Sequence, residues 1–229
     1  ADRIGPFDGI DPAFSDAASR QRFAELHFQA ADPRKARRGA LASAVRLLGF
    51  YFTLNLVPSP EGGLAAAIAG EPKAVGEAAA RAYEKAWSGA EREPASLVVA
   101  LVEGGPEQHT WRNFARALAA AARMTEEGGS VVIASDLPNV ELDEESLYEA
   151  EFPESDPHNA SMLDRDTYEL LNRTLENRRV YLVSRLERDF VEQLGLGYVS
   201  HVDELRRLSS RYERRLLLRN AQYAAPRER

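Results

Sequence analysis

A glycine pair between a strongly apolar segment and a helical pattern is the first feature suited to chemistry. Gly104 and Gly105 follow the apolar run Ala95–Val102 and precede a helical pattern over Trp111–Met124. A glycine-rich turn lets a ligand approach the backbone, and the start of a helix offers free N–H groups with a partial positive charge. This arrangement favours a bound carboxylate or phosphate. The glycines match neither the dinucleotide-binding fingerprint nor the P-loop, so on their own they also fit a plain tight turn.

The polar side chains that follow the glycines strengthen the case for anion binding. They are spaced i, i+3, i+4 and i+7, which predicts a shared helical face: His109, Arg112, Asn113 and Arg116. Arginine binds carboxylates through paired hydrogen bonds, and asparagine orients them. The alternative is that Arg112 and Arg116 are ordinary surface charges. We predict a site for a small-molecule carboxylate formed by Gly104, Gly105, His109, Asn113 and Arg116.

Other residue types point to no further catalytic centre. The 229 residues include no cysteine, which excludes disulfides, thiolate zinc sites, iron–sulfur clusters and a cysteine nucleophile. No two of the four histidines have the spacing of a helical metal site, so no metal site is predicted. A G-x-S-x-G elbow is missing, which leaves serine hydrolysis unsupported. The catalytic residues stay unknown.

The elements that must position the predicted site form a repeated unit. Continuous apolar strands are expected over 95–102, 130–134 and 179–184, with helices over 111–124 and 164–177 between them. Gly128 and Gly129 stand where a helix C-cap is expected. A strand, a helix and a strand in succession pair as parallel neighbours. The predicted fold class is therefore α/β, with three layers and a largely parallel, Rossmann-like sheet.

The flanking segments complete the predicted organisation. Helices over 16–29 and 33–48 form an N-terminal helical arm, and the segments 50–57 and 64–69 suggest a hairpin before a helix over 72–88. Further expected elements are a helical turn over 190–194, a helix over 202–208 and a last strand over 214–219. Segment 141–156 carries eight carboxylates and is typical of a solvated loop. We expect an arm over 1–43 and an α/β domain over 44–229.

Composition narrows the classes of partner. A net charge of −7, from 29 basic and 36 acidic residues, argues against nucleic-acid binding. The longest nearly uncharged run, Leu47–Pro60, is too short to cross a membrane. The sequence begins Ala-Asp-Arg without an apolar signal segment, which favours a cytoplasmic protein or a fragment of one.

Four separated segments carry a resemblance to a known family. They are Gly49–Val57 with Ala66–Gly70, Glu103–Pro106 with Trp111–Leu118, Glu127–Ala134, and Val180–Ser184 with Leu194–Gly195. Over about residues 44–225, their order and spacing resemble the C-terminal part of the nickel-dependent lactate racemase family.

The resemblance implies a two-domain α/β enzyme that racemises 2-hydroxy acids by hydride transfer, with histidines as acid and base. Its cofactor is a nickel pincer nucleotide attached to a lysine. The Gln and Lys of the family's substrate helix correspond to Asn113 and Arg116. The family's cofactor lysine has no counterpart here, because Lys35, Lys73 and Lys85 lie in helices of a different context. Of the family's histidines, only the last has a match, His27, and that match rests on its order in the chain and not on the surrounding residues. No cofactor is therefore expected in this chain.

Three function classes stay open. The first is the substrate side of a racemase or epimerase, completed by a missing N-terminal domain or by a homo-oligomer. The second is a catalytically inactive small-ligand-binding or scaffolding module. The third, a generic Rossmann-like nucleotide binder, is disfavoured because the G-x-G-x-x-G fingerprint and its ribose-binding acid are missing.

Overall fold

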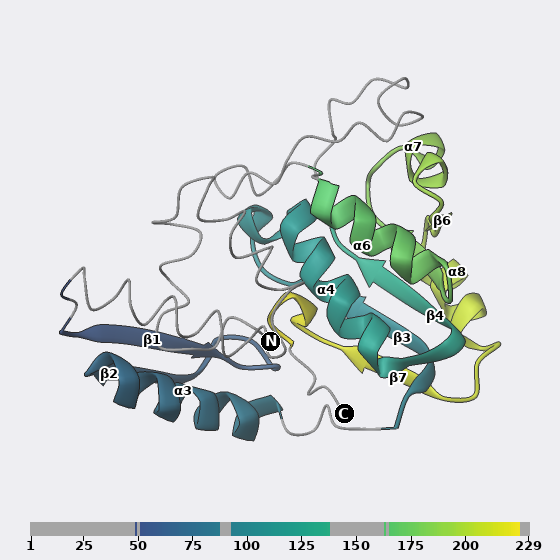
Figure 1. Ribbon diagram of the computed structural model, residues 1–229. Helices are drawn as coiled ribbons and strands as arrows, with labels where there is room; N and C mark the ends of the chain where they lie inside the picture. The colour runs from purple at the N-terminus through teal and green to yellow at the C-terminus, as the bar shows by residue number, and fades with distance from the viewer. Residues whose placement is uncertain (1–48, 50, 88–92, 138–162, 164, 225–229) are drawn as a thin grey trace. The chain divides into compact units, whose positions relative to one another are not determined.

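The computed structural model describes residues 49, 51–87, 93–137, 163 and 165–224, and the chain divides into two compact units, residues 1–88 and 89–229 (Figure 1). The predicted N-terminal helices, the acidic segment 141–156 and the proposed boundary at residue 43 lie outside the described residues. No helix in the described ranges is long and apolar enough to span a bilayer.

The first unit is a hairpin with one helix. Strands β1 (Thr53–Pro58) and β2 (Leu64–Gly70) pair antiparallel, which confirms the predicted hairpin, and α3 spans Pro72–Trp87. The helix buries a stripe at every fourth residue: Val75, Ala79, Tyr83 and Trp87. The indole N–H of Trp87 donates to the carbonyl of Pro58 over 3.0 Å. This bond and the buried stripe fix the helix against the hairpin.

The second unit is a parallel sheet of five strands in the order β6-β5-β4-β3-β7. In chain order they are β3 (Ala95–Leu101), β4 (Thr125–Ala134), β5 (Arg179–Val183), β6 (Gly197–Tyr198) and β7 (Arg215–Leu218). Every neighbouring pair runs parallel, so the predicted parallel arrangement of the strands near 96–102, 130–134 and 180–184 is confirmed. The fold is α/β, with a Rossmann-like sheet flanked by helices.

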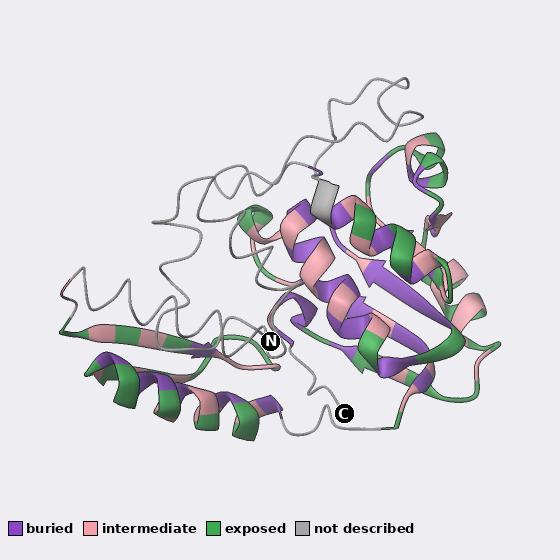
Figure 2. Cartoon of the chain, in the orientation of Figure 1, coloured by how far each residue is buried: buried purple, intermediate pink, exposed green. Residues whose placement is uncertain are grey.

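The helices of this unit connect successive strands. They are α4 (Trp111–Met124), α6 (Arg165–Leu175), α7 (Arg188–Gln193) and α8 (Val202–Ser209). Figure 1 shows α4 and α6 next to each other over the sheet, and residues of the two helices are in contact. At the centre of the sheet, Val131, Val132 and Ile133 are fully buried in succession (Figure 2). Consecutive buried residues require that both faces of this strand are covered.

The expected glycine C-cap of α4 is wrong. The helix ends at Met124, its C-cap is Thr125, and β4 begins at that same residue. Gly128 and Gly129 instead lie inside β4, where the register slips so that Ala95 faces Thr125 and Leu97 faces Ser130. Gly128 adopts a φ of 75° in this irregular stretch. The two glycines therefore permit a bulge in the strand. Glycine occurs at such bulges as well as at the ends of helices, so its presence did not distinguish the two.

Candidate functional site

The loop after β3 requires its first glycine. Gly104 adopts a φ of 127°, and a Cβ atom there would lie 2.5 Å from Cγ of Gln108. Gly105 then begins the short 3-10 helix η2 (Pro106–Gln108). The turn is tight because Gln108 folds back over Gly104, and it delivers the chain to the start of α4.

His109 lies before α4 and not on it. The N-cap of α4 is Thr110, whose hydroxyl accepts the backbone N–H of Asn113 over 3.2 Å. The backbone angles of His109 are not helical, so the prediction that His109 shares one helical face with Arg112, Asn113 and Arg116 is wrong for His109. The capping preference of Thr110 decides where the helix begins.

The ring of His109 is held by the residues that follow β4. Its Nδ1 accepts the backbone N–H of Asp136 over 3.1 Å and lies 3.2 Å from the hydroxyl oxygen of Ser135. A backbone N–H can only donate, so Nδ1 is the acceptor nitrogen in this contact. The ring proton is then on Nε2, for which no protein partner is recorded among the described residues. His109 thus presents an N–H donor.

An open pocket of about 310 Å³ lies at the carboxyl ends of β4 and β5. Its lining consists of His109 and two short segments, Ala134–Asp136 and Val183–Arg185. The carboxyl ends of parallel strands meet at one edge of the sheet, which is where open α/β folds bind ligands. The pocket therefore joins the histidine that follows the glycine loop to the ends of two neighbouring strands.

The polar groups of the pocket include three donors beside the carboxylate of Asp136. Arg185 Nη2 lies 3.1 Å from Oδ2 of Asp136, and its side chain is 86% exposed. The hydroxyl of Ser184 accepts the backbone N–H of Leu186 over 3.2 Å, which leaves its own proton available to a ligand. A guanidinium, a hydroxyl and the Nε2–H of His109 can all donate to a carboxylate.

Asn113 and Arg116 form a separate cluster with Gln108. The buried amide of Asn113 donates through Nδ2 to the carbonyl oxygen of Gln108 over 2.8 Å, and its Oδ1 accepts Nη1 of Arg116 over 2.9 Å. Oε1 of Gln108 in turn accepts the hydroxyl of Tyr223 over 2.8 Å. Of the five predicted site residues, only His109 lines the pocket, while Asn113 and Arg116 contact the glycine loop through Gln108.

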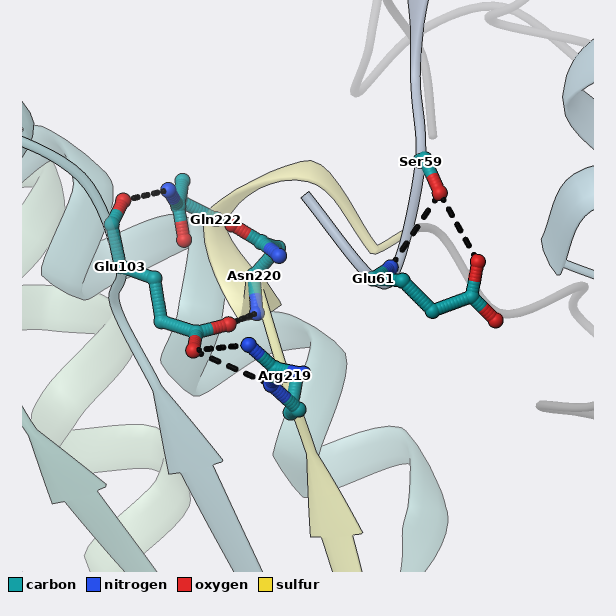
Figure 3. Close-up of polar contacts among 6 residues, drawn as sticks. All are labelled: Ser59, Glu61, Glu103, Arg219, Asn220 and Gln222. Atoms are coloured by element: carbon teal, nitrogen blue, oxygen red, sulfur yellow. Dashed lines mark hydrogen bonds and ion pairs between the residues drawn. The ribbon is translucent and has the colours of Figure 1, made fainter. Parts of the chain in front are cut away.

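Glu103 connects the ends of β3 and β7 (Figure 3). Its Oε1 accepts Nε and Nη2 of Arg219 over 3.1 and 2.8 Å, and its Oε2 accepts the backbone N–H of Asn220 over 3.0 Å. The amide of Gln222 donates to the carbonyl of Glu103 over 2.7 Å. The carboxylate therefore fastens the loop after β7 to the loop that carries the glycines.

Sequence reasoning missed the pocket residues Ser135, Asp136, Ser184 and Arg185. Ser135 and Asp136 follow the predicted strand 130–134, whereas Ser184 ends the predicted strand 179–184 and Arg185 follows it. The carboxyl ends of parallel strands share one edge. That signal was present in the sequence. The pairing of Glu103 with Arg219 had no such signal, because the two residues are more than a hundred positions apart.

The nickel nucleotide implied by the family resemblance does not fit the described residues. Among them, no group of three or more His, Cys, Asp or Glu side chains is placed to hold a metal ion. Lys73 and Lys85 lie in α3 of the first unit, and the sequence from 89 to 229 contains no lysine.

Comparison of the sequence with protein-family models and with curated proteins finds no match. Among solved structures, the chain is similar to the lactate racemase apoprotein from Thermoanaerobacterium thermosaccharolyticum, with 16% sequence identity and a TM-score of 0.57. The similarity covers 82% of this chain and 48% of that one, so the chain spans about half the length of the racemase. At this identity the likeness concerns the fold, and the chain has a lactate racemase-like fold.

Proposed function

We propose that this chain is a lactate racemase-like domain that binds a small hydroxy acid or another small carboxylate. The observation that carries the proposal is the pocket at the carboxyl ends of β4 and β5, where His109, Ser184 and Arg185 present donors within one hollow. The predicted Gly104-Gly105 loop leads directly into it through His109. Its location at the carboxyl edge of a parallel sheet adds support.

Each polar group has a role in the proposed recognition. Arg185 binds the carboxylate and exchanges its contact with Asp136 for one with the ligand. His109 donates from Nε2, because the backbone N–H of Asp136 occupies Nδ1. Ser184 supplies a hydroxyl for the second carboxylate oxygen or for the 2-hydroxy group. All three are hydrogen bonds to an ion or a polar ligand and need no rearrangement of the sheet.

The proposed site also includes the glycine loop and the two helix residues connected to it. These are Gly104, Gly105, Asn113 and Arg116. The bond from Arg116 to Asn113 suggests that Asn113 orients the guanidinium. We place the chain on the substrate side of a 2-hydroxy-acid racemase or epimerase whose cofactor is held outside the described residues. The cytoplasmic location and the missing domain or homo-oligomer also stay proposals.

Calorimetric titration of lactate into the wild-type chain and into Arg185→Ala tests the binding site. A charge-assisted hydrogen bond contributes about 1.5–3 kcal/mol, and solvent exposure of Arg185 favours the lower end. We expect the affinity for lactate to fall about tenfold. The matched control is Arg173→Ala, an exposed arginine of α6 that pairs with Glu169 over 3.7 Å and does not line the pocket. Equal affinities of wild type and Arg185→Ala would remove the pocket from the proposal.

A further inference from the structure

The floor of the pocket is apolar. Ala134 and Val183 are the last residues of β4 and β5, and they pair with each other in the parallel register. Their predecessors Ile133 and Leu182 are fully buried, whereas Ala134 and Val183 keep part of their surface accessible and line the pocket. Side chains alternate between the faces of a strand, so Ala134 and Val183 share the face opposite to Ile133 and Leu182.

The polar groups of the same pocket lie on the residues that follow each strand. Ser135 and Asp136 follow β4, and Ser184 and Arg185 follow β5. A ligand that meets both sets of residues must carry a charged or polar head and an apolar part. The pocket therefore has the composition typical of ligand sites, in which a few polar groups fix the orientation and apolar surface supplies contact area.

The size of the pocket exceeds what lactate fills. Its volume of about 310 Å³ falls within the range of about 300–1,000 Å³ typical of ligand sites. The methyl group of lactate would contact only a small part of the surface of Ala134 and Val183.

We propose that the pocket selects carboxylates whose apolar side chain is longer than the methyl group of lactate, with the head at His109, Ser184 and Arg185 and the side chain over Ala134 and Val183. This inference rests on the proposed function, since it names the class of ligand for the same site. Transfer of a methylene group from water to an apolar surface strengthens binding about fourfold.

The test is a calorimetric series on the full chain with lactate, 2-hydroxybutyrate, 2-hydroxyisovalerate and 2-hydroxyisocaproate. We expect the affinity to rise along the series, by roughly tenfold or more between the first and last members, if two or more added carbons are buried. An affinity that stays constant or falls with side-chain length would overturn this inference and leave the proposed carboxylate site standing. Failure of every member to bind would overturn the proposed function and this inference together.

A pair of variants of similar shape tests whether Val183 contacts the apolar side chain of the longer ligands. Val183→Thr keeps the shape of the side chain and replaces one methyl group by a hydroxyl on a partly accessible residue. We expect a several-fold loss of affinity for 2-hydroxyisocaproate and less than twofold for lactate. The matched control, Val202→Thr, changes an exposed valine of α8 outside the pocket and should leave both affinities unchanged. Equal effects of Val183→Thr on both ligands would contradict the proposal that the ligand side chain lies over Val183.

Discussion

Arg116 donates a hydrogen bond from Nη1 to Oδ1 of Asn113 over 2.9 Å, so the two helix residues for which the family resemblance predicts a substrate-binding role are bonded to each other. Asn113 is at the same time bonded to the backbone of Gln108. The guanidinium is therefore positioned by a buried amide that is itself fixed to the glycine loop. The contact between Arg116 and Asn113 therefore connects the guanidinium to the glycine loop.

Removal of Arg116 should weaken carboxylate binding without unfolding the protein. Arg116 does not line the pocket, so the variant Arg116→Ala tests the proposed part of the glycine loop in binding: a charge-assisted hydrogen bond lost there lowers the affinity for lactate about tenfold. Calorimetry measures the affinity, and thermal melting serves as the control for stability. Arg123→Ala, an exposed arginine in the last turn of the same helix and outside the pocket, should leave the affinity for lactate unchanged. Equal affinities of wild type and Arg116→Ala at matched melting temperatures would exclude Arg116 from the site.

Substitution of His109 by asparagine distinguishes the role of its Nδ1 atom from the role of its Nε2–H group. In His109→Asn the side-chain oxygen can replace Nδ1 as the acceptor for the N–H of Asp136, but no group replaces Nε2–H. We therefore expect a several-fold loss of carboxylate affinity with a melting temperature close to that of the wild type. His201→Asn, at the N-cap of α8 and outside the pocket, is the matched control. Wild-type affinity in His109→Asn would show that Nε2 does not contact the ligand.

Loss of the Glu103 carboxylate should destabilise the second unit. Glu103→Ala removes the hydrogen bonds from Arg219 and from the backbone N–H of Asn220. The side chains of Arg219 and Glu103 are 50% and 29% exposed, so solvent reduces the contribution, and we expect a loss of about 1–2 kcal/mol in the free energy of unfolding. Urea denaturation measures it. Glu107→Ala, an exposed glutamate of the same loop, is expected to change stability by less than about 0.5 kcal/mol.

Acid should abolish the contribution of Glu204 to stability. Its carboxylate accepts the backbone N–H and the hydroxyl of Ser200, both over 2.9 Å, and the backbone bond is the main cause that lowers the pKa of Glu204 below its usual value of 4.5. A lowered pKa in the folded state stabilises the protein above the unfolded-state pKa, and this stabilisation is lost as the pH falls through the folded-state pKa.

We therefore expect Glu204→Gln to melt below the wild type at neutral pH and the two melting temperatures to converge below pH 4.5. The exposed Glu213→Gln serves as the control and should match the wild type throughout. A difference between Glu204→Gln and the wild type that does not change with pH would show that the charge of Glu204 is not the stabilising feature.

The metal content of the purified chain tests the prediction that this chain holds no nickel. The whole sequence has four histidines and no cysteine, and the described residues bring no three metal-binding side chains together. We expect the chain purified from nickel-supplemented culture to contain far less than one nickel ion per molecule by elemental analysis. Stoichiometric nickel would contradict this prediction.

The sequence alone was sufficient to predict the parallel sheet and the order of its main elements. Runs such as Val98–Leu101 and Val131–Ile133 are apolar in succession, and only strands covered on both faces tolerate that pattern. The turn at Gly104 could also be predicted from the sequence, since Gly104 adopts a backbone conformation that other residues rarely reach. Strand β6 was missed because two residues carry no periodicity.

Only the tertiary structure decided which polar groups meet. Thr110 begins the helix after His109, so the histidine turns to the end of β4 and leaves the face that its spacing suggested. Its partner Asp136 is 27 positions away, and the pairing depends on the parallel register that brings the strand ends to one edge. Spacing along a chain predicts contacts within one helix or strand, whereas contacts between loops depend on how whole elements pack.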